Sequence, residues 1–234
     1  MDCEWSKRTS DFLKMTLAKD YTSVSYALRV EDELVAADAL GWQDQPQQIK
    51  ADERCTYNVA SVSKIYCTAA AMVLVQRGLI DLDTPVVEYV PEFTMLDEDY
   101  KKITVRHLLN HASGLPGTQW KGFSVTALTK RDYDEEVLNY LANSHLKAKP
   151  GEYSVYCNDG FTLAEIVVAR VSGQRYSDFL RENITGPIQA DSTRTIEDRN
   201  PDFPLVHEKA KPAELLLVEG AGGLTTSMID LCKF

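Results

Sequence analysis

The segment from Ser61 to Val75 constrains this chain more than any other. It begins Ser61-Val62-Ser63-Lys64 and continues through an uncharged, mostly apolar run from Ile65 to Val75. A helix that is apolar on every face belongs in a protein interior, so we expect this helix at the centre of the molecule. Three residues along a helix is close to one turn, so Ser61 and Lys64 would share a face. The pattern predicts a serine hydroxyl beside a buried lysine.

That pairing has a chemical use. A buried lysine can lose its proton near neutral pH, because low dielectric disfavours the charged form, and it could then accept the serine proton. The same spacing occurs again at Ser144-His145-Leu146-Lys147, just before Lys149-Pro150-Gly151. This second copy falls at the predicted end of a surface helix, where nothing would bury Lys147. We interpret Ser144 as an ordinary exposed serine.

Charge and the N-terminus limit the partners and the compartment. The chain of 234 residues has a net charge of −10, and no basic cluster interrupts it, which argues against nucleic acid and against anionic membranes. Met1 to Trp5 shows no basic start before an apolar core, so we expect no secretory signal. The run Ile65 to Val75 is too short for a bilayer, which needs about 20 residues. We expect a cytoplasmic protein.

Cysteine and histidine usage predicts neither a disulfide framework nor a metal site. The number of cysteines is odd and no Cys-x-x-Cys pair occurs, so free thiols in a reducing compartment fit best. His107 and His111 have the spacing of a zinc-binding helix, but no glutamate follows His107 and no third ligand is evident. We expect no metal and no cofactor.

Hydrophobic patterns predict an α+β chain with a helix, two strands and then many helices. An amphipathic helix covers Ser6 to Lys19, and alternation predicts strands at Thr22 to Val30 and Leu34 to Leu40, joined as a hairpin. Two strands alone make a poor sheet. Further helices are expected at 104–112, 132–142, 161–171, 176–183 and 226–234, with a tight glycine turn at 220–223.

We divide the chain into three parts. Residues 1–60 would form the N-terminal helix and hairpin of an α/β domain, and residues 61–215 a helical domain. Residues 216–234 would begin the return into the α/β domain.

Tyr156-Cys157-Asn158 is a second candidate site segment. Tyr156 and Asn158, two apart in an extended or loop segment, would point the same way. Tyrosine can relay a proton, and asparagine can bind a substrate amide or a lysine amine.

Taken in order, these segments resemble the serine β-lactamase and penicillin-binding protein superfamily. Within it the chain is similar to class C β-lactamases and to the related D-aminopeptidases and esterases. The resemblance implies a β-lactamase/transpeptidase-like fold, with an antiparallel sheet flanked by helices plus a helical domain. It rests on Ala60–Lys64, Gly78–Pro85, Ile103–Pro116, Pro150-Gly151 with Tyr156–Gly160, and Gly222–Leu224 with Asp230-Leu231.

The resemblance also implies roles. Ser61 would be the nucleophile and Lys64 its general base, and the backbone N–H of Ser61 would supply half of an oxyanion hole. Tyr156 would share proton transfer and protonate the leaving group. Asn158 would position the lysine and the substrate. Gln119 and Trp120 would line the substrate pocket.

The chain departs from the family at two points. Cys157 stands where serine or alanine is common, close to the site and open to modification. The third motif, a lysine or histidine with a glycine two residues later on a central strand, is not found after the glycine turn. Lys149-Pro150-Gly151 has the spacing but precedes Tyr156, and proline does not fit a central strand. The C-terminal strands of the sheet are therefore expected to be absent. The chain would be a truncated product or a fragment, completed by a C-terminal fragment or by dimerisation.

Two functions follow. The first is a serine hydrolase that forms an acyl-enzyme with a small-molecule ester, amide or β-lactam; cytoplasmic placement would favour esterase or aminopeptidase work. The alternative is a non-catalytic binding or sensor protein that is at most acylated, inactive because the third motif is missing.

Overall fold

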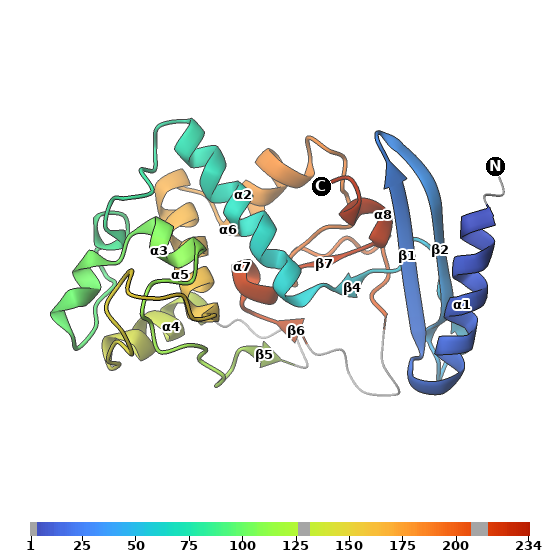
Figure 1. Cartoon of the computed structure of the whole chain (residues 1–234), viewed down its shortest axis with the longest axis horizontal. Coiled ribbons are helices and arrows are strands. Elements are labelled where there is room, and N and C mark those ends of the chain that lie inside the picture. Colours follow the sequence, from blue (N-terminus) through green and yellow to red (C-terminus); the bar gives the residue numbers. More distant parts are fainter. Residues whose placement is uncertain (1–3, 126–131, 207–214) are drawn as a thin grey trace.

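The chain has an α+β architecture, as expected from the sequence (Figure 1). The computed structural model describes residues 4–125, 132–206 and 215–234. Helix α1 (Glu4–Asp20) and the hairpin of β1 (Ser23–Val30) and β2 (Glu33–Asp44) lie at one end, and a mainly helical body lies at the other.

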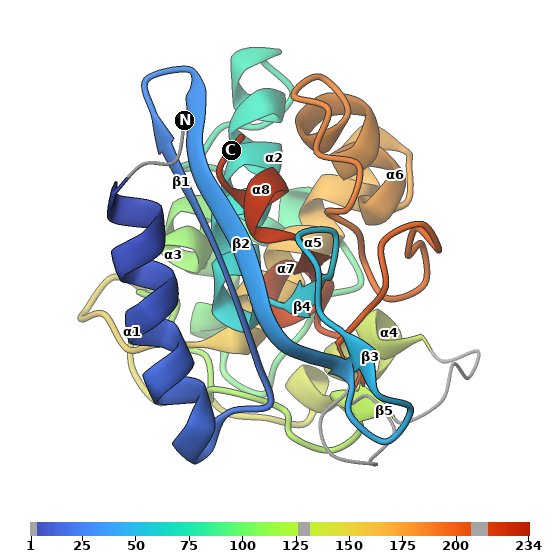
Figure 2. The same cartoon turned by 90° about the vertical axis from the view of Figure 1, so that its right-hand side faces the viewer.

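The hairpin follows from the alternation in its sequence. β1 pairs antiparallel with β2 from Ser23 opposite Gly41 to Val30 opposite Glu33. β2 runs beyond its predicted end and also pairs with β3 (Ile49–Lys50), so the sheet has the order β1-β2-β3 among the described residues. Helix α1 covers one face of the sheet and α8 (Met228–Leu231) the other (Figures 1 and 2).

The core of the helical body forms around α2 (Ser63–Gln76), which packs against α5 (Asn158–Ser172) and α7 (Glu219–Gly222). The largest fully buried side chains include Tyr66, Leu74, Phe93, Leu108, Leu163 and Phe179. The prediction that this helix lies at the centre of the molecule holds for the faces that meet α5 and α7, but not for the whole helix surface. Ile65 and Met72 are 46% and 43% exposed, so part of the uncharged run Ile65 to Val75 faces outward in the described structure.

Several predicted boundaries shift. The predicted glycine turn at 220–223 is largely the short helix α7, and the predicted last helix is reduced to α8. The other helices are α3 (Val105–Leu109), α4 (Tyr133–Ala142), α6 (Tyr176–Leu180), the 3-10 helices η1 (Ala60–Val62), η2 (Val86–Glu88) and η3 (Glu98–Lys102), and the π-helix η4 (Arg181–Thr185). Within the described ranges, none of the helices combines the length and the apolar character that a membrane crossing requires.

Two short strand pairs join distant segments. β4 (Tyr57–Asn58) pairs antiparallel with β7 (Thr225–Thr226), and β5 (Ser124–Val125) pairs with β6 (Leu215–Leu216). The β4–β7 pair brings the last described segment of the chain directly beside the start of α2, where Ser61 lies.

Candidate active site

Ser61 lies on a tight turn between β4 and α2. It belongs to the 3-10 helix η1 and lies two residues before α2 begins at Ser63. Ala60 adopts a positive φ of 45°, which is uncommon for a residue with a side chain, and Asn58 Oδ1 accepts a hydrogen bond from its N–H at 2.8 Å. Strained backbone of this kind often occurs at functional sites. Here the turn leaves the Ser61 side chain exposed.

Lys64 lies buried directly below Ser61. Its side chain is on the same helical face, as the spacing predicted, and its Nζ donates to Ser61 Oγ at 3.4 Å. Lys64 is 7% exposed, and its second partner is the carbonyl oxygen of Ala221 in α7, at 2.5 Å. The amine is thus held between the hydroxyl of Ser61 and a backbone acceptor from the far end of the chain.

Ser63 fixes the turn to the segment that carries Ala221. Its fully buried hydroxyl donates to the Ala60 carbonyl at 2.7 Å and accepts from the N–H of Leu224 at 3.1 Å. The N–H of Val59 donates to the Leu224 carbonyl at 3.0 Å. These bonds continue the β4–β7 pairing, so the same contacts hold Ser61 and the partner of Lys64 in place.

Tyr156 completes a cluster of three polar side chains. Its hydroxyl lies 2.5 Å from Ser61 Oγ, and Lys64 Nζ lies 4.8 Å from the centre of its ring. Its burial alone would raise the pKa of Tyr156, but the interactions with Lys64 and Ser61 outweigh this and lower that pKa below its ordinary value. The phenol can therefore act as a proton acceptor more readily than a free tyrosine.

His111 supports Tyr156 from behind. The two rings lie 4.6 Å apart, and His111 Nδ1 accepts a hydrogen bond from the N–H of Cys157 at 3.2 Å. Burial and the nearby Lys64 lower the pKa of His111, which favours this neutral, accepting form. His107 Nδ1 instead accepts from the N–H of Thr104 in the cap of α3. The two histidines thus have separate structural contacts.

The residues after Tyr156 hold a neighbouring loop. Asn158 Nδ2 donates to Thr118 Oγ1 at 3.0 Å, and Cys157 Sγ donates to the Gly117 carbonyl at 3.1 Å. Asp159, which is 1% exposed, accepts from the N–H of Gln119 at 2.8 Å. Asn158 was expected to contact the lysine, but here it binds the loop. Burial raises the pKa of Cys157 to about 11 and the thiol is enclosed, so the expectation of a modifiable thiol is not met.

The two proposed pocket residues lie on this loop. Gln119 is held through its backbone, because its carbonyl also accepts from the Tyr133 hydroxyl at 2.6 Å. Trp120 is 65% exposed, and its ring packs edge-on against Phe123 with centroids 5.0 Å apart. The structure brings Ser61, Lys64 and Tyr156 into direct contact, whereas Gln119 and Trp120 contact their own loop and the residues that hold it.

The second Ser-x-x-Lys copy has no such environment. The hydroxyl of Ser144 donates to the Tyr140 carbonyl at 2.7 Å, and Lys147 is exposed. The exposure of Lys147 agrees with the interpretation from the sequence, whereas Ser144 is half-buried rather than exposed. The described cysteines, Cys55, Cys67, Cys157 and Cys232, are all free thiols, and Cys3 lies outside the described residues.

The sequence did not reveal that helix α7 supplies a hydrogen-bond partner for Lys64. Gly220 precedes Ala221, and its N–H donates to Glu165 Oε2 from the buried helix α5. A Cβ at Gly220 would lie 2.7 Å from that oxygen and 3.0 Å from Cys67 Sγ. Only glycine allows this approach, and the approach sets the position of the Ala221 carbonyl. The only sequence signal was the glycine run itself.

Comparison with known protein families gives a match over nearly the whole chain. A family model described as Beta-lactamase matches residues 11–234. Penicillin-binding protein 4* of Bacillus subtilis (strain 168) is 26% identical over 163 residues, which is 69% of this chain and 35% of that protein. The matched part thus spans about a third of the length of that relative.

Superposition on solved structures identifies the fold of this chain. The D-amino acid amidase from Ochrobactrum anthropi SV3, complexed with L-phenylalanine amide, superimposes with a TM-score of 0.82 at 22% identity, covering 99% of this chain and 69% of that chain. A class C beta lactamase superimposes with a TM-score of 0.81 at 20% identity, covering 99% and 65%. The β-lactamase/transpeptidase-like fold expected from the sequence is confirmed.

The packing around Gly220 predicts a stability effect. Gly220→Ala should lower the free energy of unfolding by about 1–3 kcal/mol, because the added methyl group overpacks the contact with Glu165 and Cys67. Urea denaturation measures this. Gly160→Ala is the matched control within a helix, since a Cβ there meets only ordinary contacts from 3.7 Å outward. It should be neutral or stabilising by up to about 1 kcal/mol. Equal effects of the two substitutions would contradict the role given to Gly220.

Proposed function

This chain belongs to the beta-lactamase family, and on that premise we propose that it is a serine hydrolase that forms an acyl-enzyme on Ser61. The observation that carries the proposal is the contact of one exposed hydroxyl with two proton-transfer groups. Ser61 Oγ lies 2.5 Å from the Tyr156 hydroxyl and 3.4 Å from Lys64 Nζ. A serine is a weak nucleophile unless an adjacent base activates it, and this arrangement supplies two candidates.

Acylation would proceed in two proton transfers. As Ser61 Oγ attacks the carbonyl carbon of the substrate, its proton passes to Lys64, directly or through Tyr156. The backbone N–H of Ser61 would donate to the developing oxyanion. When the tetrahedral intermediate collapses, Tyr156 gives a proton to the leaving amine or alcohol and takes one back from Lys64, and the acyl group remains on Ser61 as an ester. Water then attacks this ester, so the acid is released and the hydroxyl of Ser61 is restored.

The substrate class we propose is a small ester or amide. The named relatives support this choice, since one is an amidase bound to an amino acid amide, one a penicillin-binding protein and one a beta lactamase. We also propose that Gln119 and Trp120 form part of the pocket wall, with Asn158 placing this wall through Thr118. Because the chain spans only part of these relatives, these statements about substrate and activity are proposals for the whole protein.

The alternative from the sequence, a protein that is acylated without turnover, differs in one measurable property. A hydrolase releases the acyl group and restores Ser61, whereas a sensor keeps a stable one-to-one adduct. The lifetime of the adduct therefore separates the two functions. No support for the inactive alternative comes from the relatives named above.

The first prediction concerns the nucleophile. Exposure to a fluorophosphonate, and separately to a penicillin, should give one adduct that peptide mapping places on Ser61. Ser61→Ala should abolish the adduct, because no other hydroxyl has the same partners in the described structure. Ser144→Ala, from the second Ser-x-x-Lys copy, should label like the unmodified chain. Labelling retained by Ser61→Ala would remove Ser61 as the nucleophile.

The second prediction concerns the base. Lys64→Ala should slow acylation by about 10²–10⁴-fold, the usual contribution of a general base. Stopped-flow measurement with a chromogenic ester gives this rate. Lys147→Ala is the matched control and should leave the rate unchanged, since Lys147 is exposed. An acylation rate that survives Lys64→Ala would show that Tyr156 acts alone.

The third prediction concerns pH. The pKa of Tyr156 is lowered, so as pH rises through it the phenol loses its proton and can accept that of Ser61. Acylation should therefore accelerate across this range, and Tyr156→Phe should remove the acceleration as well as slow the reaction. An unchanged pH–rate profile in Tyr156→Phe would assign the titration to another group.

A further inference from the structure

His111 binds the backbone on both sides of Tyr156. Its carbonyl oxygen accepts a hydrogen bond from the N–H of Val155 at 2.9 Å, and its Nδ1 accepts from the N–H of Cys157 at 3.2 Å. These two N–H groups belong to the residues immediately before and after Tyr156. A single residue therefore holds the backbone from which the Tyr156 side chain projects, and the proposed hydrolase function gives that residue no role.

The backbone of His111 has an unusual conformation. Its φ is 61°, in the left-handed region that few residues other than glycine adopt and in which histidine and asparagine are enriched. Contacts on either side hold it there. Ser154 Oγ donates to the Asn110 carbonyl at 2.9 Å, and the N–H of Gly151 donates to the Ala112 carbonyl at 2.8 Å. His111 is thus the middle one of three consecutive residues that all bind the segment 151–157.

The His111 ring packs against the same aromatic rings as Lys64. The His111 ring centroid lies 4.6 Å from that of Tyr156 and 5.1 Å from that of Phe161. Lys64 Nζ lies 4.8 Å and 5.4 Å from the same two centroids, within the range of a cation–π contact. A shift of the Tyr156 ring would therefore change the surroundings of Lys64 as well as those of Ser61.

The hydrogen bond to Cys157 requires the neutral form of His111. A backbone N–H can only donate, so Nδ1 must be unprotonated and the ring carries its proton on Nε2. Burial and the nearby Lys64 lower the pKa of His111 below its ordinary value, so the ring is neutral at pH about 7 and above. The charged group that acts on both the His111 ring and Tyr156 is Lys64, which comes from α2.

Burial alone does not fix the position of Tyr156. Its side chain is 53% exposed, yet its hydroxyl lies 2.5 Å from Ser61 Oγ. A misplacement of about 1 Å at a reacting group can cost about 10²-fold in rate. We propose that His111 is a positioning residue, which sets the Tyr156 hydroxyl against Ser61 by holding the backbone on both sides of the tyrosine. The kinetic consequences rest on the proposed hydrolase function, whereas the placement of the phenol does not.

Two substitutions separate the hydrogen bond of His111 from the packing of its ring. His111→Asn keeps an acceptor, because the Oδ1 of asparagine is attached to Cγ as Nδ1 is in histidine, and asparagine also tolerates the left-handed backbone. His111→Phe keeps an aromatic ring against Tyr156 but cannot accept from the N–H of Cys157. The proposal requires that His111→Phe disturb Tyr156 more than His111→Asn does.

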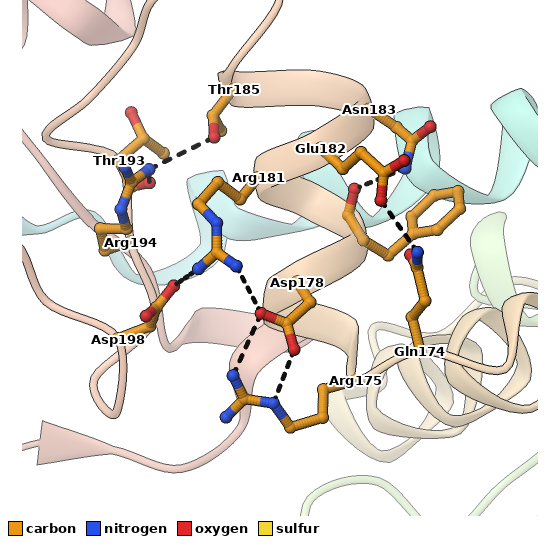
Figure 3. Close-up of polar contacts among 11 residues, drawn as sticks. Gln174, Arg175, Asp178, Arg181, Glu182, Asn183, Thr185, Thr193, Arg194 and Asp198 are labelled. Atoms are coloured by element: carbon orange, nitrogen blue, oxygen red, sulfur yellow. Dashed lines mark hydrogen bonds and ion pairs between the residues drawn. The ribbon is translucent and has the colours of Figure 1, made fainter.

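Arg181→Ala controls for a general loss of stability. It breaks the ion pairs of Arg181 with Asp178 and Asp198, which involve none of the residues around Tyr156 (Figure 3). Exposed ion pairs contribute about 1 kcal/mol or less, so this variant should be slightly destabilised with an unchanged site. Urea denaturation verifies that all variants are folded and compares their stabilities.

The first readout is the pKa of the Tyr156 phenol. NMR of the chain with isotope-labelled tyrosine measures it, and the signal that disappears in Tyr156→Phe identifies it. Burial alone would raise this pKa, but the contacts with Lys64 and Ser61 lower it. His111→Phe should move it back up toward the ordinary value of about 10, because the phenol leaves these partners. His111→Asn and Arg181→Ala should leave it low.

The second readout is the hydrolysis of a chromogenic ester. His111→Phe should lower kcat about tenfold or more and leave KM nearly unchanged, since His111 acts through Tyr156 and has no place in the proposed pocket wall. The acceleration with rising pH should also move to higher pH, following the phenol. His111→Asn should keep kcat within about threefold of the unmodified chain.

Three outcomes would overturn the proposal. These are the same pKa of Tyr156 in the unmodified chain and His111→Phe, equal effects of His111→Phe and His111→Asn, and a rise in KM alone for His111→Phe. Failure of the acyl-enzyme proposal is seen separately, as the absence of an adduct on Ser61 in the unmodified chain. The pKa comparison needs no turnover, so it decides the role of His111 in either case.

Discussion

The burial of Lys64 is the constraint on which the rest of the structure depends. An amine that is 7% exposed inside an apolar helix must find polar partners, since an uncompensated buried charge costs several kcal/mol. Ser61 Oγ supplies one partner, and the other is the carbonyl of Ala221, 157 residues further along the chain. The β4–β7 pair and the bond from Leu224 to Ser63 place that carbonyl. The buried lysine therefore keeps its second partner only when the last described segment folds in this way.

The parts of this site that the sequence predicted are those with a local pattern. The spacing of Ser61 and Lys64 is a pattern within one helical turn. The alternation that predicted the hairpin is a pattern within each single strand. The β-lactamase-like fold followed from several weak motifs in the right order. The Ala221 carbonyl could not be predicted, because a backbone acceptor has no side-chain signature and its contact spans most of the chain.

Tertiary contacts explain the predictions that were wrong. A run of glycines favours a turn, yet 219–222 is helical, and Gly220 lies close against Glu165 and Cys67. The uncharged run Ile65 to Val75 favours burial on every face, yet α2 is covered on the faces that meet α5 and α7, and Ile65 remains exposed. Composition alone does not say how many faces of a helix the neighbouring elements cover.

Helix α7 also ties the active site to the buried helix α5. On one flank its Ala221 carbonyl holds Lys64, and on the other the N–H of the preceding Gly220 is bound by Glu165 of α5. These two backbone groups belong to neighbouring residues of a short helix, so the position of one is tied to that of the other. The close contact at Gly220 leaves little room for the helix to move without breaking a buried bond.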